Sequence, residues 1–360
     1  AWVFNMRGND IEYNPLVISY AVIGKNDAWL FVNKHKISSD LLGALMDAGV
    51  NLLDYNQFGK HLFNLHGGIW LDEKTASYSM LDMTAPESEI ILAASPVVLA
   101  KACKNPIEVA GAENAHAKDA IAVINFLHWL DTNWQLGVTE MSCADKLSEF
   151  RSQQEHLKGM SFHSVSGFAG NGAIVHYKAV PKTDKIVDNS SLYLIDSGGQ
   201  YLEGTTDITR TLHLGNPIKE QKRHYTLVLK GHLALGRAVF PHGTCGEHLD
   251  VLARNALWQS HLNYAHGTGH GVGSFLCAHE GPQKISGAIS NTPLLPGMVV
   301  SNEPGLYIAG EYGIRIENLC LIKDVQTDSE YGPFYCFETL TLVPYARKLI
   351  DIDFVLVYEP

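Results

Sequence analysis

The chain has 360 residues, a formal net charge of −11, 46% hydrophobic residues and 18% charged residues, the composition of an ordinary globular protein. An acidic balance of this size argues against a nucleic-acid surface, and no apolar run approaches the ~18 residues that a membrane helix requires. The six cysteines form no CxxC pair and no regular framework, a pattern typical of reduced thiols. We therefore expect a cytoplasmic protein with no nucleic-acid partner and no membrane partner.

The two ends of the sequence suggest a piece of a longer protein. It begins without methionine and leads straight into an apolar run, and it stops without a closing element. No secretory signal peptide is recognisable at the start. The number of domains predicted below is therefore a lower limit.

The first hundred residues predict a small α/β unit. Residues 16–23 and 28–32 have the composition of two short strands, joined by the turn residues 24–27. The segment that follows has helical spacing, with Ser39 or Asp40 as the expected N-cap.

A stronger helix start stands at Asn105 and Pro106. Asparagine is favoured at the N-cap, and proline is favoured at the first helical position because its missing N–H is not needed there. The helix behind it, roughly residues 107–129, is the longest that the sequence predicts. We place the domain boundary just before it, which gives a partial N-terminal domain over residues 1–104 and a second domain over residues 105–360.

The second domain mixes helices with alternating strands. This arrangement predicts an α+β fold rather than a parallel doubly wound sheet. No GxGxxG follows a strand and no P-loop is present, so nucleotide binding has no support. The predicted strands are residues 192–196, 206–214, 298–303 and 313–322.

Two aspartates give the first indication of chemistry. Asp196 ends an apolar strand, and Asp207 lies on the next strand, eleven positions later. The residues between them are too few for anything but a hairpin, with Glu203 and Gly204 as turn residues. Two carboxylates brought together in this way repel each other unless a cation lies between them. Taken alone, two unrelated surface acids on a hairpin explain this spacing better.

Three histidines give the second indication. His266, His270 and His279 fall within HGTGHGVGSFLCAHEGP, where glycines alternate with them. A zinc-protease helix would carry HExxH, but here the glutamate is missing and the glycines oppose a helix. His266 and His270 therefore belong to a strand or tight loop, and the glycines let the backbone approach a ligand closely. A single histidine would more often be a core residue.

Two glutamates give the third indication. Glu303 ends an apolar strand and precedes Pro-Gly, while Glu317 lies in GIRIEN, where Arg315 on the same face could orient a carboxylate. The plain alternative is a strand-end acid plus a surface Arg–Glu pair.

Together, however, two Asp, one His and two Glu form an oxygen-rich donor set that favours Mn²⁺ or a similar ion over structural Zn²⁺. Two such ions held by bridging carboxylates generate a bridging hydroxide at neutral pH, which is hydrolytic machinery.

These blocks resemble a known family. LIDSGGQYLEGTTDITRT, HGTGHGVGSFLCAHEGP, NEPG and GIRIEN are similar to the metal-site blocks of the Xaa-Pro aminopeptidases (aminopeptidase P), which are pita-bread metallopeptidases related to prolidase and methionine aminopeptidase. WVFNMRGNDIEYNP, KNPIEVAGAENAHAKDA and GFAGNGAIVHYKA are similar to the eukaryotic cytosolic type. The resemblance covers nearly the whole chain, and it implies a creatinase-like α/β N-terminal domain before a pita-bread catalytic domain.

The resemblance also implies roles for single residues. Asp207 and Glu317 would bridge two metals, Asp196 would complete one of them, and His270 with Glu303 would complete the other. Glu303 would also handle the proton of the attacking water. The remaining catalytic assignments are His279, which would stabilise the oxyanion, and His176 with His266, which would frame the proline side of the substrate.

The sequence departs from the family in three respects. The family's first domain and part of its second are missing, and so is the C-terminal helical region associated with dimerisation. Cys277 is a thiol two residues before His279, and a small buried apolar role suits it better than chemistry. The full-length protein is expected to be a homodimer.

The resulting hypothesis is a metalloexopeptidase that removes an N-terminal residue preceding proline, by means of a hydroxide bridging two divalent ions. Mn²⁺ is the favoured ion, with Zn²⁺ or Co²⁺ as alternatives. The rival functions are a prolidase-type Xaa-Pro dipeptidase and a non-catalytic pita-bread binding module. Peptides with proline at the second position are the expected partners.

Overall fold

The computed structural model describes residues 1–326 and 328–357, and the chain divides into two compact units between Lys101 and Ala102. The predicted domain limits of 1–104 and 105–360 stay a prediction, because compactness alone does not define an independently folding domain. No helix in the described part of the chain is both long and apolar enough to cross a bilayer.

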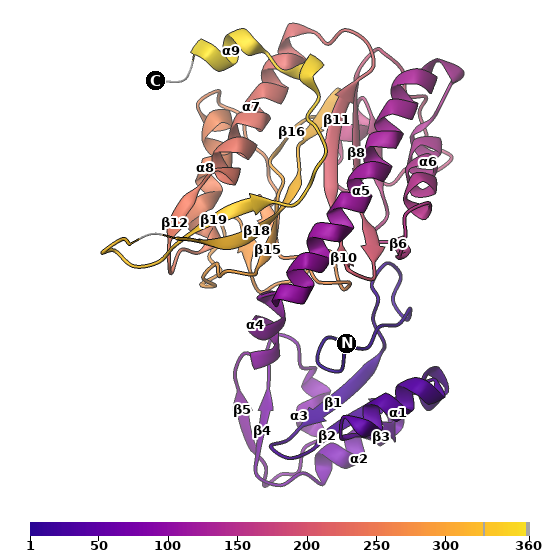
Figure 1. Cartoon of the computed structure of the whole chain (residues 1–360), viewed down its shortest axis with the longest axis vertical. Coiled ribbons are helices and arrows are strands. Elements are labelled where there is room, and N and C mark those ends of the chain that lie inside the picture. The colour runs from indigo at the N-terminus through magenta and orange to yellow at the C-terminus, as the bar shows by residue number, and fades with distance from the viewer. Residues whose placement is uncertain (327, 358–360) are drawn as a thin grey trace. The chain divides into compact units, whose positions relative to one another are not determined.

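The first unit contains two small sheets with helices around them (Figure 1). Strands β1 and β2 pair antiparallel with Ile23 opposite Ala28, which confirms the predicted strands and turn. Strand β3 runs parallel to β2, and β4 runs parallel to β5. The elements are β1 (Ser19–Ile23), β2 (Ala28–Val32), α1 (Ser39–Asp47), β3 (Val50–Asp54), α2 (Phe58–Phe63), β4 (Gly68–Leu71), α3 (Tyr78–Asp82), β5 (Glu89–Leu92) and α4 (Pro96–Ala102).

The N-cap of α1 corrects the sequence prediction. Neither Ser39 nor Asp40 is the cap; it is Ser38, whose hydroxyl accepts a hydrogen bond from the Leu41 N–H at 3.3 Å. Ser38 alone has the extended backbone that lets its side chain turn back onto the first turn, whereas Ser39 is already helical.

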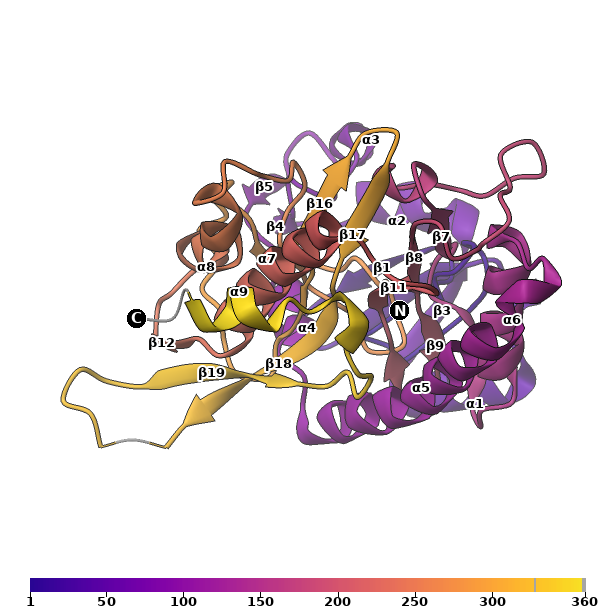
Figure 2. The ribbon, with the colours of Figure 1, turned by 90° about the horizontal axis from the view of Figure 1, so that it is seen from above.

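The second unit places its strands between two pairs of helices. Helices α5 and α6 pack together on one side, and α7 and α8 pack together on the other, as Figures 1 and 2 show. The helices are α5 (Pro106–Asn133), α6 (Glu140–Ser152), α7 (Lys219–Gly236), α8 (Gly246–Trp258) and α9 (Ile352–Val357). This α+β arrangement agrees with the predicted fold class.

Helix α5 begins as predicted. The side chain of Asn105 accepts hydrogen bonds from the N–H groups of Ile107 and Glu108, at 2.9 and 3.0 Å. Glu108 in turn accepts from the Asn105 N–H at 3.0 Å, so a full capping box closes the helix start.

The strands of the second unit form short antiparallel sheets. In the first of them β8 lies between β7 and β11, and in another β18 lies between β15 and β19. The strands are β6 (Leu157–Met160), β7 (Val165–Phe168), β8 (Leu192–Ser197), β9 (Gly199–Tyr201), β10 (Gly204–Thr205), β11 (Ile208–His213), β12 (Val239–Pro241), β13 (Gly269–His270), β14 (Lys284–Ile285), β15 (Val299–Asn302), β16 (Gly305–Ile308), β17 (Tyr312–Arg315), β18 (Asn318–Val325) and β19 (Phe334–Thr339).

Strand β8 is apolar from Leu192 to Ile195, where both of its faces are buried. Tyr193 and Ile195 pack in a cluster with Phe126 of α5, whereas Leu192 packs with Tyr225 of α7 on the other side. Alternate residues of a strand face opposite ways, so a strand between two helix layers needs no polar face.

The predicted strand limits differ in detail. Asp207 does not lie on the strand predicted over residues 206–214, because β11 begins only at Ile208. Residues 313–322 do not form one strand, because the chain breaks at Ile316 and Glu317 between β17 and β18. The hairpin between the two aspartates is present, but its turn is Leu202–Glu203, and Gly204 already pairs with Tyr201. The break at Glu317 takes that side chain out of a regular pleat.

We predict that Gly231→Ala destabilises the second unit. Gly231 is buried in α7, and an added Cβ would lie 2.0 Å from the Ala253 carbonyl oxygen of α8, so the two helices would have to separate. Overpacking of this kind costs ~1–3 kcal/mol, which thermal unfolding would detect. Gly43→Ala in α1 is the control: its Cβ meets open space, so it should stabilise the helix by ~1 kcal/mol. Equal melting curves for Gly231→Ala and the unmodified chain would contradict the packing argument.

Candidate metal centre

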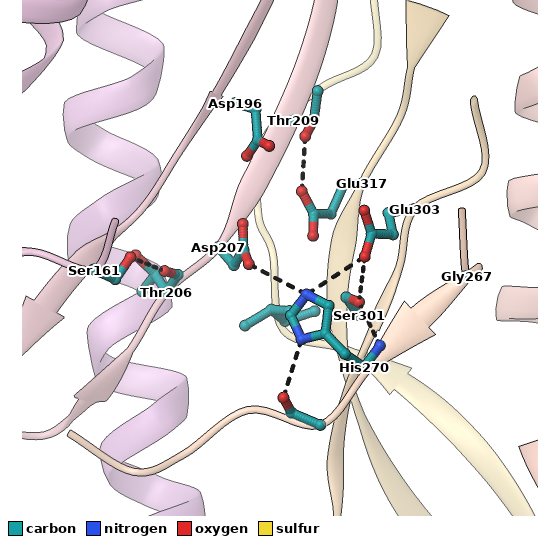
Figure 3. A network of polar contacts seen from close by, with 12 residues as sticks. Ser161, Asp196, Thr206, Asp207, Thr209, Gly267, His270, Ser301, Glu303 and Glu317 are labelled. Carbon is teal, nitrogen blue, oxygen red and sulfur yellow. Dashed lines mark hydrogen bonds and ion pairs between the residues drawn. The ribbon is translucent and has the colours of Figure 1, made fainter. Parts of the chain in front are cut away.

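A cavity of about 550 Å³ in the second unit is lined by every residue that the sequence analysis selected as a site residue. These side chains come from segments far apart in the chain, yet they line one cavity. Figure 3 shows five of them close together: Asp196, Asp207, His270, Glu303 and Glu317. The eight residues are His176, Asp196, Asp207, His266, His270, His279, Glu303 and Glu317.

Strand ends position the two aspartates. Asp196 is the fifth residue of β8, and its partner across the antiparallel ladder is Thr209 of β11. Asp207 lies just before β11, two residues from Thr209, so the hairpin brings the two carboxylates together. The oxygen atoms of Asp196, Asp207 and Glu317 all lie within 4.8 Å of one another.

A close approach of two backbones positions His270. A Cβ on Gly269 would lie 2.0 Å from the Ser301 carbonyl oxygen, so only glycine lets β13 pack against β15 at this point. The His270 N–H also donates to the Ser301 hydroxyl at 2.9 Å. Glu303, directly after β15, then places Oε1 at 3.4 Å from His270 Nε2.

The protonation of His270 follows from its contacts. Its Nδ1 lies 3.0 Å from the Gly271 carbonyl oxygen, which can only accept, so the ring proton belongs on Nδ1. Burial and the neighbouring His279 lower the pKa of His270 to about 3, so the ring is neutral at pH 7. Its bare Nε2 therefore faces Glu303 and, at 3.7 Å, the Asp207 carboxylate.

Each buried carboxylate makes ionisation of its neighbours less favourable. Burial, followed by the charges of neighbouring acids, raises the pKa of Asp207 and of Glu317 well above the ordinary range. Burial raises the pKa of Glu303 to about 8, against the lowering effect of Arg315. Several acids crowded beside a bare imidazole nitrogen form an unfavourable arrangement for ionised groups unless cations lie between them.

Arg315 compensates part of this charge. Its guanidinium donates to Asp196 Oδ2 at 2.7 Å, to the Tyr307 hydroxyl at 2.8 Å and to the Thr209 hydroxyl at 3.1 Å. The sequence prediction that Arg315 orients a carboxylate is confirmed, and that carboxylate is Asp196. The other oxygen of Asp196, Oδ1, is buried and has no hydrogen-bond partner among residues 1–326 and 328–357.

These features fit divalent cations. The described residues form three overlapping donor groups, and Asp207, His270 and Glu317 each belong to two of them. The groups combine carboxylate oxygens with two, one or no imidazoles, a set that suits hard or borderline divalent ions. An orphaned buried Oδ1 of Asp196 and a bare Nε2 of His270, each next to further donors, are what a metal site requires of its ligands.

Two hydroxyl groups that hydrogen-bond the predicted metal ligands were not predicted from the sequence. The Thr209 hydroxyl donates to Glu317 Oε2 at 2.7 Å, and the Ser301 hydroxyl donates to Glu303 Oε1 at 3.1 Å. Thr209 stands two residues after Asp207 and Ser301 two residues before Glu303, so same-face spacing along a strand was the available indication. Such contacts fix the orientation of metal ligands.

The remaining histidines lie around the donor group. The ring of His279 stands edge-on to His270 with centroids 4.1 Å apart, and His279 also forms a donor group with Asp207 and His270. His266 Nε2 lies 2.9 Å from the Tyr307 hydroxyl, and burial lowers the pKa of His266 to about 4. His176 is exposed at the cavity lining.

A cavity lined by acids that can hold more than one divalent ion is the site of a metal-dependent hydrolase. Residues 110–324 match the model of metallopeptidase family M24, and residues 1–108 match the creatinase/prolidase N-terminal domain. The chain therefore belongs to metallopeptidase family M24. Its fold is a creatinase-type α/β domain followed by the pita-bread catalytic domain.

Similar proteins agree with this membership. A probable Xaa-Pro aminopeptidase P of Sclerotinia sclerotiorum is 43% identical over 98% of this chain and 61% of its own length. Aminopeptidase P1 of Arabidopsis thaliana is 38% identical, covering 98% of this chain and 63% of its own. The chain thus spans about three fifths of the length of these curated relatives.

A solved structure is similar over the same extent. The X-prolyl aminopeptidase of Caenorhabditis elegans, described as a cytosolic enzyme with a di-nuclear active site, has a TM-score of 0.92 and 35% identity. The match covers 98% of this chain and 59% of that one. The X-Pro aminopeptidase of Thermotoga maritima, with a TM-score of 0.72 and 26% identity, covers 91% of this chain and 87% of its own.

We predict that Glu303→Gln stabilises the metal-free protein increasingly as the pH rises from about 5 to about 8. The raised pKa of Glu303 means that its stabilising, protonated form is present below its ordinary pKa of 4.5 and is lost as the pH passes about 8. Glutamine does not ionise, so the variant avoids this loss. Chemical denaturation of both chelator-treated proteins across this range measures the difference. A difference that does not change with pH would contradict the electrostatic description.

Proposed function

We propose that this chain carries the catalytic machinery of an Xaa-Pro aminopeptidase, which hydrolyses the bond between an N-terminal residue and a following proline. The observation that carries the proposal is the convergence of Asp196, Asp207, His270, Glu303 and Glu317 on one cavity. Relatives at 38–43% identity, named as aminopeptidases P, support the choice of substrate.

Two divalent ions would suit this donor set. Asp207 and Glu317 would hold both ions, with Asp196 as a further ligand of one and His270 and Glu303 as further ligands of the other. The grouping of Asp196 with Asp207 and Glu317, and of His270 with Glu303 and Glu317, supports this division. We favour Mn²⁺, with Zn²⁺ or Co²⁺ as alternatives, because carboxylate oxygens dominate the set. When bound, such ions polarise the peptide carbonyl and lower the pKa of water.

Two side chains handle protons and charge in this mechanism. Glu303 accepts the proton of the attacking water and delivers it to the proline nitrogen that leaves. The Ser301 hydroxyl holds the Glu303 carboxylate by a hydrogen bond, which fixes its orientation for both transfers. His279 donates a hydrogen bond to the oxygen that becomes negative in the transition state.

His176 and His266 line the side of the cavity that accommodates proline. The bond before proline is a tertiary amide without an N–H, so ring shape rather than hydrogen bonding must select the substrate. His266 is held by Tyr307, and its backbone neighbour Gly267 accepts from its Nδ1 at 2.7 Å, so the ring presents a fixed, uncharged face.

Two other functions are kept as alternatives. A prolidase-type dipeptidase uses a similar cavity, and solved prolidases share this fold. A non-catalytic binding module is disfavoured because all five donors are present. We also propose a cytoplasmic location, as described for the worm relative, and a homodimer for the full-length protein.

Metal content tests the ligand assignment. Asp207→Ala should lose bound metal and activity together, because it removes a donor shared by two groups. His279→Ala is the matched control: it should keep metal while kcat falls by ~10²–10³, the cost of one oxyanion donor. Elemental analysis after desalting, combined with the peptide assay, separates the two. Full metal occupancy in Asp207→Ala would refute the assignment.

The length of the peptide and the residue at its second position test the proposed activity. We predict that the Mn²⁺-loaded chain cleaves an Xaa-Pro-Xaa tripeptide and leaves the Xaa-Ala-Xaa peptide largely intact, because only proline has the ring that the histidines accommodate. The matched Xaa-Pro dipeptide should be the poorer substrate. Chromatographic detection of the released N-terminal residue gives the rates. Cleavage confined to the dipeptide would establish the prolidase alternative instead.

A further inference from the structure

The segment from His176 to Lys178 forms part of the cavity wall. All three residues line the cavity, but His176 and Lys178 are exposed while Tyr177 between them is buried. The side chains of His176 and Lys178 are therefore open to solvent, while Tyr177 holds the backbone between them. The cavity wall therefore carries a histidine and a lysine two positions apart.

Tyr177 is anchored by a buried acid. Its hydroxyl lies 2.9 Å from Oε2 of Glu140, which is fully buried at the start of α6, and accepts from the Asn171 amide at 2.8 Å. Glu140 also accepts from the backbone N–H groups of Phe168 at 2.6 Å and Lys185 at 3.1 Å. One carboxylate thus joins both ends of the segment that carries His176 and Lys178.

Lys178 differs from the other cation of the cavity lining. The guanidinium of Arg315 is committed to Asp196, Tyr307 and Thr209. The Lys178 ammonium has neither a hydrogen bond nor an ion pair to any part of the chain that the structure describes. An anchored backbone therefore presents an unpaired positive charge at the edge of the cavity.

We propose that Lys178 binds the C-terminal carboxylate of an Xaa-Pro-Xaa tripeptide substrate, on the residue that follows proline. The inference rests on the proposed function, which places proline at His176 and His266. Cα atoms two residues apart in the chain are at most ~7 Å apart, so the residue that follows a proline at His176 lies within reach of the Lys178 side chain.

The expected contribution is modest because Lys178 is exposed to solvent. Ion pairs of this kind contribute little in water, and the corresponding preference for a charged over a neutral substrate is about twofold to fivefold. Salt screens such a pair, so the preference should shrink as the ionic strength rises.

The test compares one Xaa-Pro-Xaa tripeptide as its free acid and as its C-terminal amide. With the Mn²⁺-loaded chain, kcat/KM should favour the free acid by about twofold to fivefold, through KM rather than kcat. Lys178→Met should bring the ratio close to one, and Lys178→Arg should restore most of it. Lys182→Met, at an exposed lysine of the same segment outside the cavity lining, is the matched control and should keep the ratio of the unmodified chain.

The outcomes separate this inference from the proposed function. A ratio near one in the unmodified chain, or an unchanged ratio in Lys178→Met, overturns the role of Lys178 while cleavage of the amide still supports the aminopeptidase activity. Failure of the metal-loaded chain to cleave either peptide overturns both.

Discussion

Mutual repulsion among buried carboxylates is the constraint on which the second unit depends. Asp207 and Glu317 are almost fully buried, and Asp196 and Glu303 stand beside them with their own charges. Arg315 offsets only part of this charge, and His270 is neutral. A fold that brings these acids together without cations would lose stability at neutral pH. Bound divalent ions would offset this repulsion.

The strands and helices around the site hold these acidic side chains close together. Each donor lies at or next to a strand end, where the chain leaves the regular pleat and a side chain can turn toward the cavity. The helix pairs α5–α6 and α7–α8 bury both faces of β8, which fixes the position of Asp196. Gly269 permits the backbone contact that brings His270 to Glu303, and Gly231 permits the packing of α7 on α8.

Much of this was predictable from the sequence, for identifiable reasons. The hairpin around Asp196 and Asp207 followed from the short spacing, and the Asn105–Pro106 helix start followed from capping chemistry. The convergence of the hairpin with the histidine and glutamate blocks did not follow from spacing, because long-range packing decides it; the family resemblance supplied it. Ser38 was missed because neighbouring serines and Asp40 are all good caps, and only backbone geometry selects one. Thr209, Ser301 and the Glu140 anchor were missed because single hydroxyls and a helix-start glutamate are common without any such role.

If the five donors hold two ions, a crystal structure of the chain grown with Mn²⁺, with anomalous data collected at the manganese edge, should show both. Two anomalous peaks are expected ~3.5–4 Å apart in the cavity, with carboxylate oxygens of Asp207 and Glu317 between them. A single peak, or peaks away from these five side chains, would contradict the two-ion assignment.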